Sequence, residues 1–427
     1  MSQKVTRNKK GANDKIVLGL VGAGGRGTTM ILDFYKNCKG VEVKYICDVD
    51  ATRGGHAISE LGKMQGFKPQ RVEDMRRVYE DKDVDAVIIA NPEHWHALSM
   101  IWACQADKHV YVEKVISMSI HEGEKMIEAT QKYNRIVQCG TQNRSGDSNI
   151  TARDYVKSGK LGRILNVKAY CMLQGAKPWS MKEDSPVPPG LNWDMWLGPA
   201  NKVPYNVSRH KAPYDWWDYS PGLQMAMANH VIDLARMVVG DPDNPQSVYS
   251  TGGRVLYDDK RDVPDIQAIT YDYKDFTMSL ECGVFGSYMD KTKSDVRFGK
   301  KFPNWRVDGT RIEIYGTEGL MYVGIMGGGW QVFDQEGNIK AQEHGYFPDE
   351  NHQRNFIDCL RSGNTPNGDI IQGHKSSSLI HLANLAYRAG NKHLYLDSAE
   401  GKIANSPEAE LISQGHYRTP FTIPDII

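Results

Sequence analysis

The stretch Lys15–Gly27 constrains the fold of this chain most strongly, and its sequence is KIVLGLVGAGGRG. The apolar run Ile16–Val21 predicts a buried strand, and a glycine turn and a helix-like segment follow it. Strand, glycine turn and helix in this order are typical of dinucleotide binding: Gly22 permits the tight turn, Gly24 lets the backbone approach a pyrophosphate, and Gly27 lets the helix pack closely. We therefore predict a bound nicotinamide or flavin nucleotide, held at the turn by Gly22, Gly24, Gly25, Arg26 and Gly27.

A second strand and an acid follow in the expected order. The segment Val41–Cys47 alternates and is rich in β-forming residues. It ends at Asp48, where this fold places an acid on the hydroxyls of the adenosine ribose. An acid there repels a 2′-phosphate, so we expect NAD rather than NADP, although Arg53 lies close enough to make the distinction less sharp.

Two domains are the natural division of 427 residues. Strand-like and helix-like segments alternate as far as about residue 140, which predicts βαβ units and a doubly wound parallel sheet. Later strand-like segments lack regular intervening helices, which predicts an α+β domain with an open, mostly antiparallel sheet. We expect an α/β protein with a flexible arm (residues 1–14), a dinucleotide-binding Rossmann domain (15–142) and a C-terminal substrate-binding domain (143–427).

Charge and composition exclude several classes of partner. Basic and acidic residues number 52 each, which argues against binding to nucleic acid or to an anionic membrane. No apolar run approaches the roughly twenty residues of a membrane span, and residues 1–14 lack the apolar core of a secretory signal. The seven cysteines are scattered without a CxxC pair, which predicts reduced thiols in a cytoplasmic protein.

Three polar clusters follow predicted strands of the parallel sheet, whose carboxyl ends face the ligand crevice. Asn91–His96 follows Asp85–Ala90, Glu113 and Lys114 follow His109–Val112, and Cys139–Arg144 follows Ile136–Gln138. We expect all three clusters beside the nucleotide. The predicted cofactor contacts from them are Asn91, Pro92, His94, Trp95, His96, Glu113, Lys114, Gln142 and Asn143.

Lys114 is the best catalytic candidate by position. A lysine partly removed from water beside a nicotinamide could move the proton of a substrate hydroxyl. The alternative is a surface lysine paired with Glu113. His94 and His96 have the spacing of a metal-ligand pair, but no third ligand follows at a useful spacing, so we expect no metal.

The segment beginning at Asn229 and His230 is helix-like, with Asp233 one turn after His230 on the same face. His230 could act as an acid or base toward a bound hydroxyl, and a core or helix-capping histidine is the alternative. Aromatic faces stack on sugar rings, and aromatic residues crowd an insertion at about residues 179–221. We expect Trp193 and Trp196 to be structural. The predicted substrate contacts are Arg144, Trp179, Tyr214, Trp216, Trp217, Asn229 and His230.

With these residues in hand, the chain resembles the Gfo/Idh/MocA family, named for glucose–fructose oxidoreductase and inositol dehydrogenase. The resemblance covers essentially the whole chain and includes the motifs GLVGAGGRG, NPEHWHA, VYVEK, QCGTQNRS, WLGPA, HVIDLARM, IYGTEG, NFIDCLRSGNTP and HLANLAYRAG, the last of them typical of a sugar-related bacterial branch. It implies NAD(P)-dependent oxidation of a ring hydroxyl of a sugar, sugar derivative or cyclitol. It also implies homo-oligomers formed through the C-terminal sheet, with the family's catalytic lysine on Lys114 and its substrate-side histidine on His230.

The chain departs from the family pattern at three positions. Val115 stands where proline is usual after the lysine, so we expect no cis peptide bond there. Ala226 stands where an aspartate is usual four residues before His230, and Ala228 replaces a usual glycine. These departures keep two alternatives open. One is a redox-neutral, NAD-dependent glycosidase or lyase that acts through a transient keto-sugar, and the other is a protein that binds nucleotide or sugar without turnover.

Overall fold

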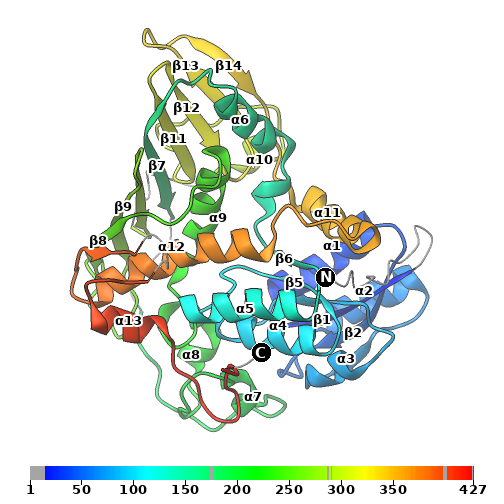
Figure 1. Cartoon of the computed structure of the whole chain (residues 1–427). Helices are drawn as coiled ribbons and strands as arrows, with labels where there is room; N and C mark the ends of the chain where they lie inside the picture. Colours follow the sequence, from blue (N-terminus) through cyan, green and yellow to red (C-terminus); the bar gives the residue numbers. More distant parts are fainter. Residues whose placement is uncertain are drawn as a thin grey trace, which may run out of the picture.

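The computed structural model describes residues 15–173, 177, 179–285, 288–289, 291–397, 402–425 and 427. The predicted flexible arm, residues 1–14, lies outside the described residues. Two sheets organise the described part of the chain, and helix α12 (Ile370–Arg388) lies between them (Figure 1).

The first sheet has six parallel strands in the order β3-β2-β1-β4-β5-β6, which is the strand order of the Rossmann fold. Buried apolar runs form its central strands, as the sequence predicts. The strands are β1 (Ile16–Val21), β2 (Val41–Cys47), β3 (Gln70–Val72), β4 (Ala86–Ile89), β5 (His109–Val112) and β6 (Val137–Cys139). The connecting helices are α1 (Gly25–Asn37), α2 (Gly55–Gln65), α3 (Arg76–Glu80), η1 (Glu93–Trp95), α4 (His96–Gln105) and α5 (Ile120–Lys132).

Helices cover both faces of this sheet. Met30 and Phe34 of α1 pack on one face, together with Phe356 of the much later helix α11 (Asp349–Ser362). Residues of α4 and α5, such as Leu98 and Met126, pack on the other face. The first sheet therefore takes one of its covering helices from the C-terminal part of the chain.

The second sheet has nine strands in the order β14-β13-β12-β11-β7-β10-β9-β8-β15, and every pairing is antiparallel except β7 with β10. Its inner face packs on α6 (Asp147–Lys157), α9 (Leu223–Val238) and α12. These two sheets confirm the predicted α/β fold class. The strands are β7 (Ile164–Met172), β8 (Ser247–Gly253), β9 (Ile266–Asp272), β10 (Thr277–Gly283), β11 (Arg311–Gly316), β12 (Gly319–Gly324), β13 (Trp330–Phe333), β14 (Ile339–Glu343) and β15 (Leu394–Tyr395).

The aromatic insertion between β7 and α9 folds over the carboxyl edge of the first sheet. It contains α7 (Trp193–Leu197), α8 (Val207–Lys211) and the single turn η3 (Pro213–Asp215). The Trp95 indole N–H donates to the Met195 carbonyl at 2.9 Å, and the Asn192 N–H donates to the Val49 carbonyl at 3.0 Å. The insertion therefore covers this chain's own nucleotide-binding edge.

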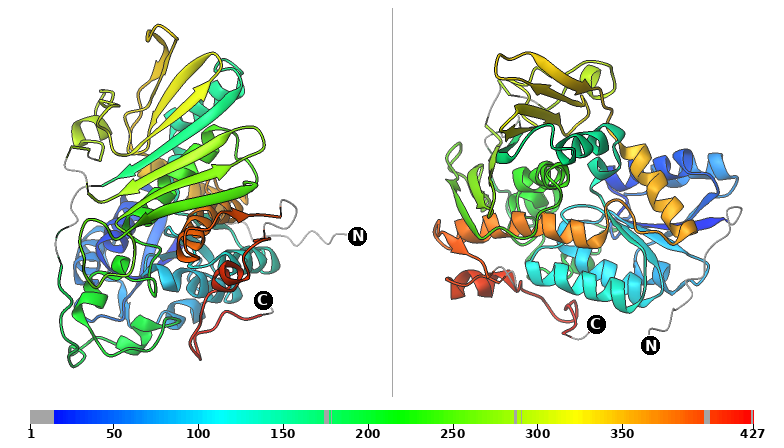
Figure 2. Two further views of the ribbon diagram at one scale, coloured as in Figure 1. Left: turned by 90° about the vertical axis from the view of Figure 1, so that its left-hand side faces the viewer. Right: turned by 45° about the horizontal axis from the view of Figure 1, so that its top comes forward.

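Contacts between the first sheet's layers and the late helices α11 and α12 tie the two ends of the chain together. The Gln138 side chain of β6 donates to the His352 carbonyl of α11 at 2.8 Å. Gly123 of α5 lies directly against His374 of α12, and any side chain at position 123 would overlap the imidazole. The view in Figure 2, left, shows the strands of the second sheet with helices behind them. The domain division at residues 142/143 stays a prediction. No helix among the described residues is both long and apolar enough to cross a membrane.

Candidate active site

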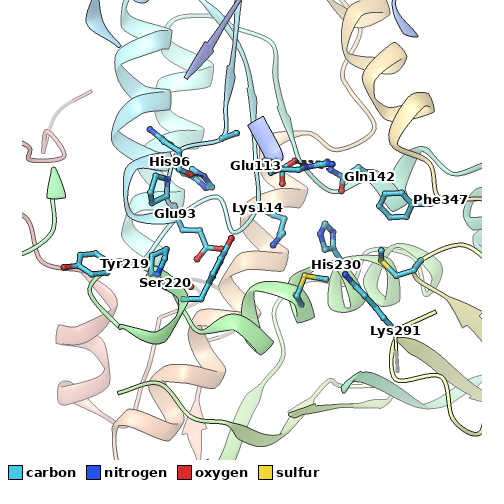
Figure 3. A pocket seen from close by; sticks show the side chains of 18 of the residues that line it. Glu93, His96, Glu113, Lys114, Gln142, Tyr219, Ser220, His230, Lys291 and Phe347 are labelled. Carbon is cyan, nitrogen blue, oxygen red and sulfur yellow. Dashed lines mark hydrogen bonds and ion pairs between the residues drawn. The ribbon is translucent and has the colours of Figure 1, made fainter. Parts of the chain in front are cut away.

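A cavity of about 290 Å³ opens between the carboxyl edge of the first sheet, the insertion and helix α9 (Figure 3). The first-sheet side supplies residues that follow β4, β5 and β6, while α9 supplies Met227 and His230. The predicted site residues that line this cavity are Arg26, Asn91, Pro92, His96, Glu113, Lys114, Gln142, Tyr214 and His230.

A narrower cavity of about 50 Å³ continues along the same edge of the sheet. Asn91 and Pro92 line both cavities, so the two spaces meet at the end of β4. The predicted cofactor residues Gly22, Gly24, Asp48 and Trp95 line this second space, and so does Arg53. This arrangement suits an extended ligand that lies across the carboxyl ends of β1, β2 and β4.

The glycine turn fits a dinucleotide. Gly22 has a φ of 92°, and a Cβ there would lie 2.4 Å from the Asn91 nitrogen. A Cβ on Gly27 would lie 1.9 Å from the Gly22 carbonyl oxygen, so this glycine allows the close contact of α1 with the turn. Gly25, the first residue of α1, faces open space. The helix N-terminus is thus free to receive phosphate oxygens.

Two polar groups near the turn also fit a bound dinucleotide. The Asn91 side-chain amide is buried, and neither its nitrogen nor its oxygen has a hydrogen-bond partner among the described residues. Asp48 accepts hydrogen bonds from the Ala23 N–H at 2.8 Å and the Asp50 N–H at 2.9 Å, which fix its carboxylate beside the turn. Burial raises the pKa of Asp48, while Arg53 acts against that shift.

Lys114 lies in the centre of the larger cavity (Figure 3). Its ammonium group makes no hydrogen bond or ion pair with any described residue. The peptide bond between Lys114 and Val115 is cis, so the expectation from the missing proline was wrong. Val115 is fully buried, and its carbonyl lies 2.7 Å from the His96 ring. These contacts of Val115 are tertiary, and residue type alone does not reveal them.

Glu113 does not pair with Lys114. Its carboxylate accepts from the Arg26 side chain at 3.1 Å and from the Gln142 amide at 3.3 Å. Arg26 also pairs with Asp349 at 3.1 Å, so Glu113 and Arg26 both have charged or polar partners other than Lys114. The alternative of a surface Lys114 paired with Glu113 is therefore excluded.

Glu93 is the functional candidate that the sequence analysis missed. Its side chain is 5% exposed, it lines the cavity, and neither carboxylate oxygen has a well-formed hydrogen bond to a described residue. Burial raises the pKa of Glu93 to about 7, against the opposing influence of Lys114, the Ser220 hydroxyl and the Val115 N–H. A carboxyl group in this state can take up or release a proton near neutral pH.

His230 lines the cavity from the middle of α9. The helix begins at Leu223, earlier than the sequence analysis placed it, so His230 is not at its start. Burial and the nearby charges of Lys114 and Arg26 hold the pKa of His230 well below its usual range. The imidazole is therefore neutral at pH 7 and can donate or accept one hydrogen bond at each ring nitrogen, according to its tautomer. Ala226 lies one turn earlier on the same helix and offers no carboxylate, and Asp233, one turn after His230, is paired with Arg144 at 2.8 Å.

Three polar residues predicted at the site lie away from both cavities. Arg144 is buried and donates to Asp233 at 2.8 Å and to Asp241 at 2.8 Å, so it serves a buried ion-pair network instead of the substrate. Asn143 accepts from Asn149 at 2.9 Å through its carbonyl. Asn229 accepts from Ser377 of α12 at 3.3 Å. Arg144 and Asn143 therefore join elements of the fold. Asn229 also joins two helices, but its buried amide nitrogen has no partner among the described residues, so its substrate contact stays a prediction.

The predicted aromatic contacts also need correction, because only Tyr214 lines the cavity. Trp216 is 3% exposed and lies beneath the Arg209 guanidinium at 4.3 Å. Trp179 packs edge-on against Trp216, and Trp217 lies beside Arg388. Trp193 and Trp196 stack in the core of the insertion at 4.6 Å, as expected. Aromatic crowding here mostly builds the insertion's own core.

The two histidines of the Asn91–His96 cluster differ in their positions. His94 lies outside both cavities, packs on Trp196 and Tyr219, and has a ring nitrogen 2.9 Å from the Trp196 carbonyl. His96 lines the larger cavity, with its ring nitrogens beside the carbonyls of Val115 and Asn91. No group of three or more His, Cys, Asp or Glu side chains suited to a metal ion occurs among the described residues.

Two family models match this chain, one in its N-terminal part and one after it. A family model described as "Oxidoreductase family, NAD-binding Rossmann fold" matches residues 16–141, and its companion, "Oxidoreductase family, C-terminal alpha/beta domain", matches residues 150–308. The chain belongs to the Gfo/Idh/MocA family. This family assignment confirms both the predicted resemblance and the expected NAD cofactor.

Two relatives of this Gfo/Idh/MocA protein have names that refer to a sugar or a glycoside. Levoglucosan dehydrogenase of Pseudarthrobacter phenanthrenivorans is 28% identical over 193 residues, which is 45% of this chain and 42% of that protein. A glycosyl hydrolase family 109 protein of Shewanella woodyi is 27% identical over 170 residues, which is 39% of this chain and 36% of that protein. These alignments span about two fifths of each relative's length.

The fold is also shared with a solved structure. The WlbA dehydrogenase from Bordetella pertussis, in complex with NADH and UDP-GlcNAcA, is similar with a TM-score of 0.63 and 19% identity. The match covers 90% of this chain and 99% of that one. At this identity the similarity concerns the fold.

Proposed function

We propose that this protein is an NAD(P)-dependent oxidoreductase that oxidises a ring hydroxyl of a sugar, sugar derivative or cyclitol. The observation that carries the proposal is the convergence of Lys114, His230 and Glu93 in one cavity, next to the glycine turn. The carbohydrate relatives and the NADH-bound neighbour support the substrate class and the cofactor. A bound nicotinamide supplies a hydride acceptor, and the chain's own residues must remove the hydroxyl proton.

The three side chains have separable roles in this proposal. Lys114 and the neutral His230 hold the reacting hydroxyl oxygen, because both can donate a hydrogen bond to it. Glu93 lies beside Lys114 and can accept the proton that the hydroxyl loses when the ring carbon gives up its hydride. The substrate thereby loses one proton and one hydride and becomes a ketone. Glu93 supplies the carboxylate that Ala226 cannot.

Around these residues, the glycine turn and the predicted cofactor residues that line the two cavities bind the nucleotide in this proposal. We propose that Gly22, Gly24, Gly25 and Gly27 shape the phosphate site and that Asp48 faces the adenosine ribose. Further contacts come from the cavity-lining side chains of Arg26, Asn91, Pro92, Trp95, His96, Glu113 and Gln142.

A redox-neutral glycosidase or lyase is the second candidate. Glu93 favours it specifically, since a carboxyl with a pKa of about 7 can donate a proton to a leaving-group oxygen at neutral pH. The glycosyl hydrolase family 109 relative supports this candidate as well. A protein that binds without turnover is the third outcome of the same test.

The deciding experiment combines the protein and NAD with free sugars and aryl glycosides, and follows NADH absorbance and leaving-group release in the same wells. NADH formation without release supports the dehydrogenase. Release without net NADH supports the cleavage reaction. Silence in both channels, together with measurable NADH binding, refutes both catalytic proposals for the sugars tested.

We also propose a homo-oligomer formed through the outer face of the second sheet. Partly exposed tyrosines gather on this face, among them Tyr170, Tyr315 and Tyr322, and aromatic residues are enriched at interfaces.

A cytoplasmic location is also part of the proposal, supported by seven cysteines that are all free and buried. We retain the division into residues 15–142 and 143–427 as the proposed domain boundary.

A further inference from the structure

The larger cavity has a basic end that the sequence analysis did not anticipate. Lys291 and Arg297 line it from the segment after β10, and Arg297 ends the short helix α10 (Ser294–Arg297). Figure 3 shows Lys291 next to His230, on the side of the cavity away from Glu93. The cavity is thus polarised, with a carboxyl at one end and cations at the other.

Arg297 is held in place without an acid partner. Its guanidinium stacks on the Phe347 ring at 4.1 Å, and Phe347 also lines the cavity. The Arg297 Nε is buried without a hydrogen-bond partner, and the guanidinium forms no ion pair with any described residue. Asp349 is close enough to influence Arg297, but its carboxylate is engaged by Arg26 at 3.1 Å. A fixed, partly buried guanidinium with free donors is a binding group for an anion.

Cationic side chains outnumber the carboxyl groups that line the cavity. Of the four cationic side chains that line it, Arg26 is neutralised by Glu113 and Asp349. Of the other three, Lys114 and Arg297 form no ion pair with a described residue, and Glu93 is the one lining carboxyl left to face them in the described part of the chain. Burial, together with the charges of Arg297 and Lys114, lowers the pKa of Lys291. An anionic group bound among these cations would relieve their repulsion.

The basic end lies on the substrate side of the cavity. Arg26 is the cation of the glycine turn, at the second residue of α1, where phosphates of the nucleotide are expected. Lys291 instead lies near Cys171 of β7 and beside His230 of α9, both in the second sheet's half of the structure. Lys291 therefore faces the part of the cavity left to the sugar, while Arg297 stacks on Phe347, where the charges of Asp349 and Arg26 also act on it.

We propose that the substrate carries an anionic substituent, a carboxylate or a phosphate, which Arg297 binds with its guanidinium fork and Lys291 assists. This inference rests on the proposed function and narrows its substrate class. A charge-assisted pair of this kind contributes roughly 1.5–3 kcal/mol, so a tenfold to hundredfold preference is expected for the charged sugar.

The test compares each neutral hexose with its uronic acid and its 6-phosphate. Binding to the protein preloaded with NADH is measured by calorimetry, and turnover with NAD is measured in parallel. We expect one charged form to bind at least tenfold more tightly than its neutral parent. Arg297→Met is expected to reduce that ratio to about one. Arg306→Met, an exposed cation of the same segment, is the control that should keep the ratio.

Each outcome bears on a separate claim. Equal binding of neutral and charged sugars, or an unchanged ratio in Arg297→Met, overturns the inference. A tenfold loss of NADH affinity in Arg297→Met and Lys291→Met, with no change in the sugar ratio, also overturns it, because the cations then serve the dinucleotide. Preferential binding of a charged sugar without turnover upholds the inference and counts against the proposed oxidation. The carboxylate and phosphate series distinguish the two anions.

Discussion

Arg144 donates from Nε to both carboxylate oxygens of Asp233, at 2.8 and 3.0 Å, with both side chains almost fully buried. This pair joins the turn after β6 of the first sheet to helix α9 beneath the second sheet. It explains why a residue that sequence position places beside the nucleotide is unavailable to the substrate.

Breaking this pair should destabilise the protein. Arg144→Met leaves two carboxylates, Asp233 and Asp241, without their main partner, and we expect a loss of about 3–5 kcal/mol in the free energy of unfolding. Urea denaturation measures it. The double variant with Asp233→Asn should lose less than the two single variants added together. Lys63→Met, which breaks an exposed pair with Glu60, is the control and should change stability by less than about 0.5 kcal/mol. A similarly small effect of Arg144→Met would contradict the structural role.

Replacing Lys114 should stop the chemistry. Lys114→Met removes the cation from the centre of the cavity, and we expect kcat to fall roughly 10²–10⁴-fold. NADH binding, followed by fluorescence, should persist, because the glycine turn and Asp48 stay intact. Lys82→Met, a lysine outside both active-site cavities, is the matched control. Unchanged kcat in Lys114→Met would remove this lysine from the mechanism.

Glu93 should give activity a pH dependence near neutrality. Because burial raises its pKa to about 7, the carboxylate form that accepts a proton is lost as pH falls below that value. We expect kcat/KM of the oxidation to decrease toward acid pH, and Glu93→Gln to have low activity without this limb. His230 does not produce the limb, since its pKa lies well below its usual range. An identical acid limb in Glu93→Gln would assign it to another group.

Glu122 should lower stability at alkaline pH. It is fully buried near the start of α5, where it accepts from the Met118 N–H at 2.6 Å, and burial raises its pKa from 4.5 to about 7. A raised folded-state pKa favours folding below pH 4.5, and this contribution is lost as pH rises through 7. Ionisation therefore costs up to about 3 kcal/mol.

The corresponding variant is Glu122→Gln. We expect urea midpoints close to the parent's near pH 4.5 and clearly higher ones above pH 7, because glutamine keeps the acceptor and never ionises. Glu124→Gln, an exposed substitution on the same helix, should show no such trend. A parallel pH profile for Glu122→Gln and the parent protein would show that Glu122 stays uncharged or is solvated when it ionises.

Two glycines of the turn should respond differently to alanine. Gly27→Ala places a Cβ 1.9 Å from the Gly22 carbonyl, so we expect a loss of about 2 kcal/mol or more in stability, together with weaker NADH binding. Gly25→Ala meets no atom within 4 Å, so stability should change by less than about 0.5 kcal/mol. Because Gly25 is the first residue of α1, where we propose that the phosphates bind, NADH affinity should still fall. Unaltered NADH binding by both variants would place the nucleotide elsewhere.

The sequence predicted the first sheet well because its strands are short, buried apolar runs separated by helical periodicity. β1, β2 and β5 have the predicted bounds, and the strand-edge rule located Lys114 and Asn91 correctly at the cavity. The rule predicts where the backbone leaves the sheet, however. It does not predict which way the side chains point in the turn that follows the strand. That is why Asn143 and Arg144, in η2 (Gln142–Ser145), point into the fold.

Tertiary packing decided the remaining site residues. Glu93 belongs to a polar cluster that the sequence brings to the sheet edge, but its burial depends on Ser220 and the insertion that covers it. Lys291 and Arg297 come from a segment without periodicity, so no local pattern places them opposite the sheet. Trp216 is the opposite case: the sequence predicted it at the site, but it packs in the small core of the insertion. An aromatic residue suits either place, so its type does not distinguish them.

Helix α12 lies between the two sheets, with His374 closely packed on Gly123 of α5. The ribosome completes this helix only after residue 388, long after the six strands of the first sheet have left the exit tunnel. Until then, the face of α5 that receives α12 and the face of α1 that receives Phe356 stay open to solvent. The nucleotide-binding half therefore exposes apolar surface for most of translation, until α11 and α12 are made and can cover it.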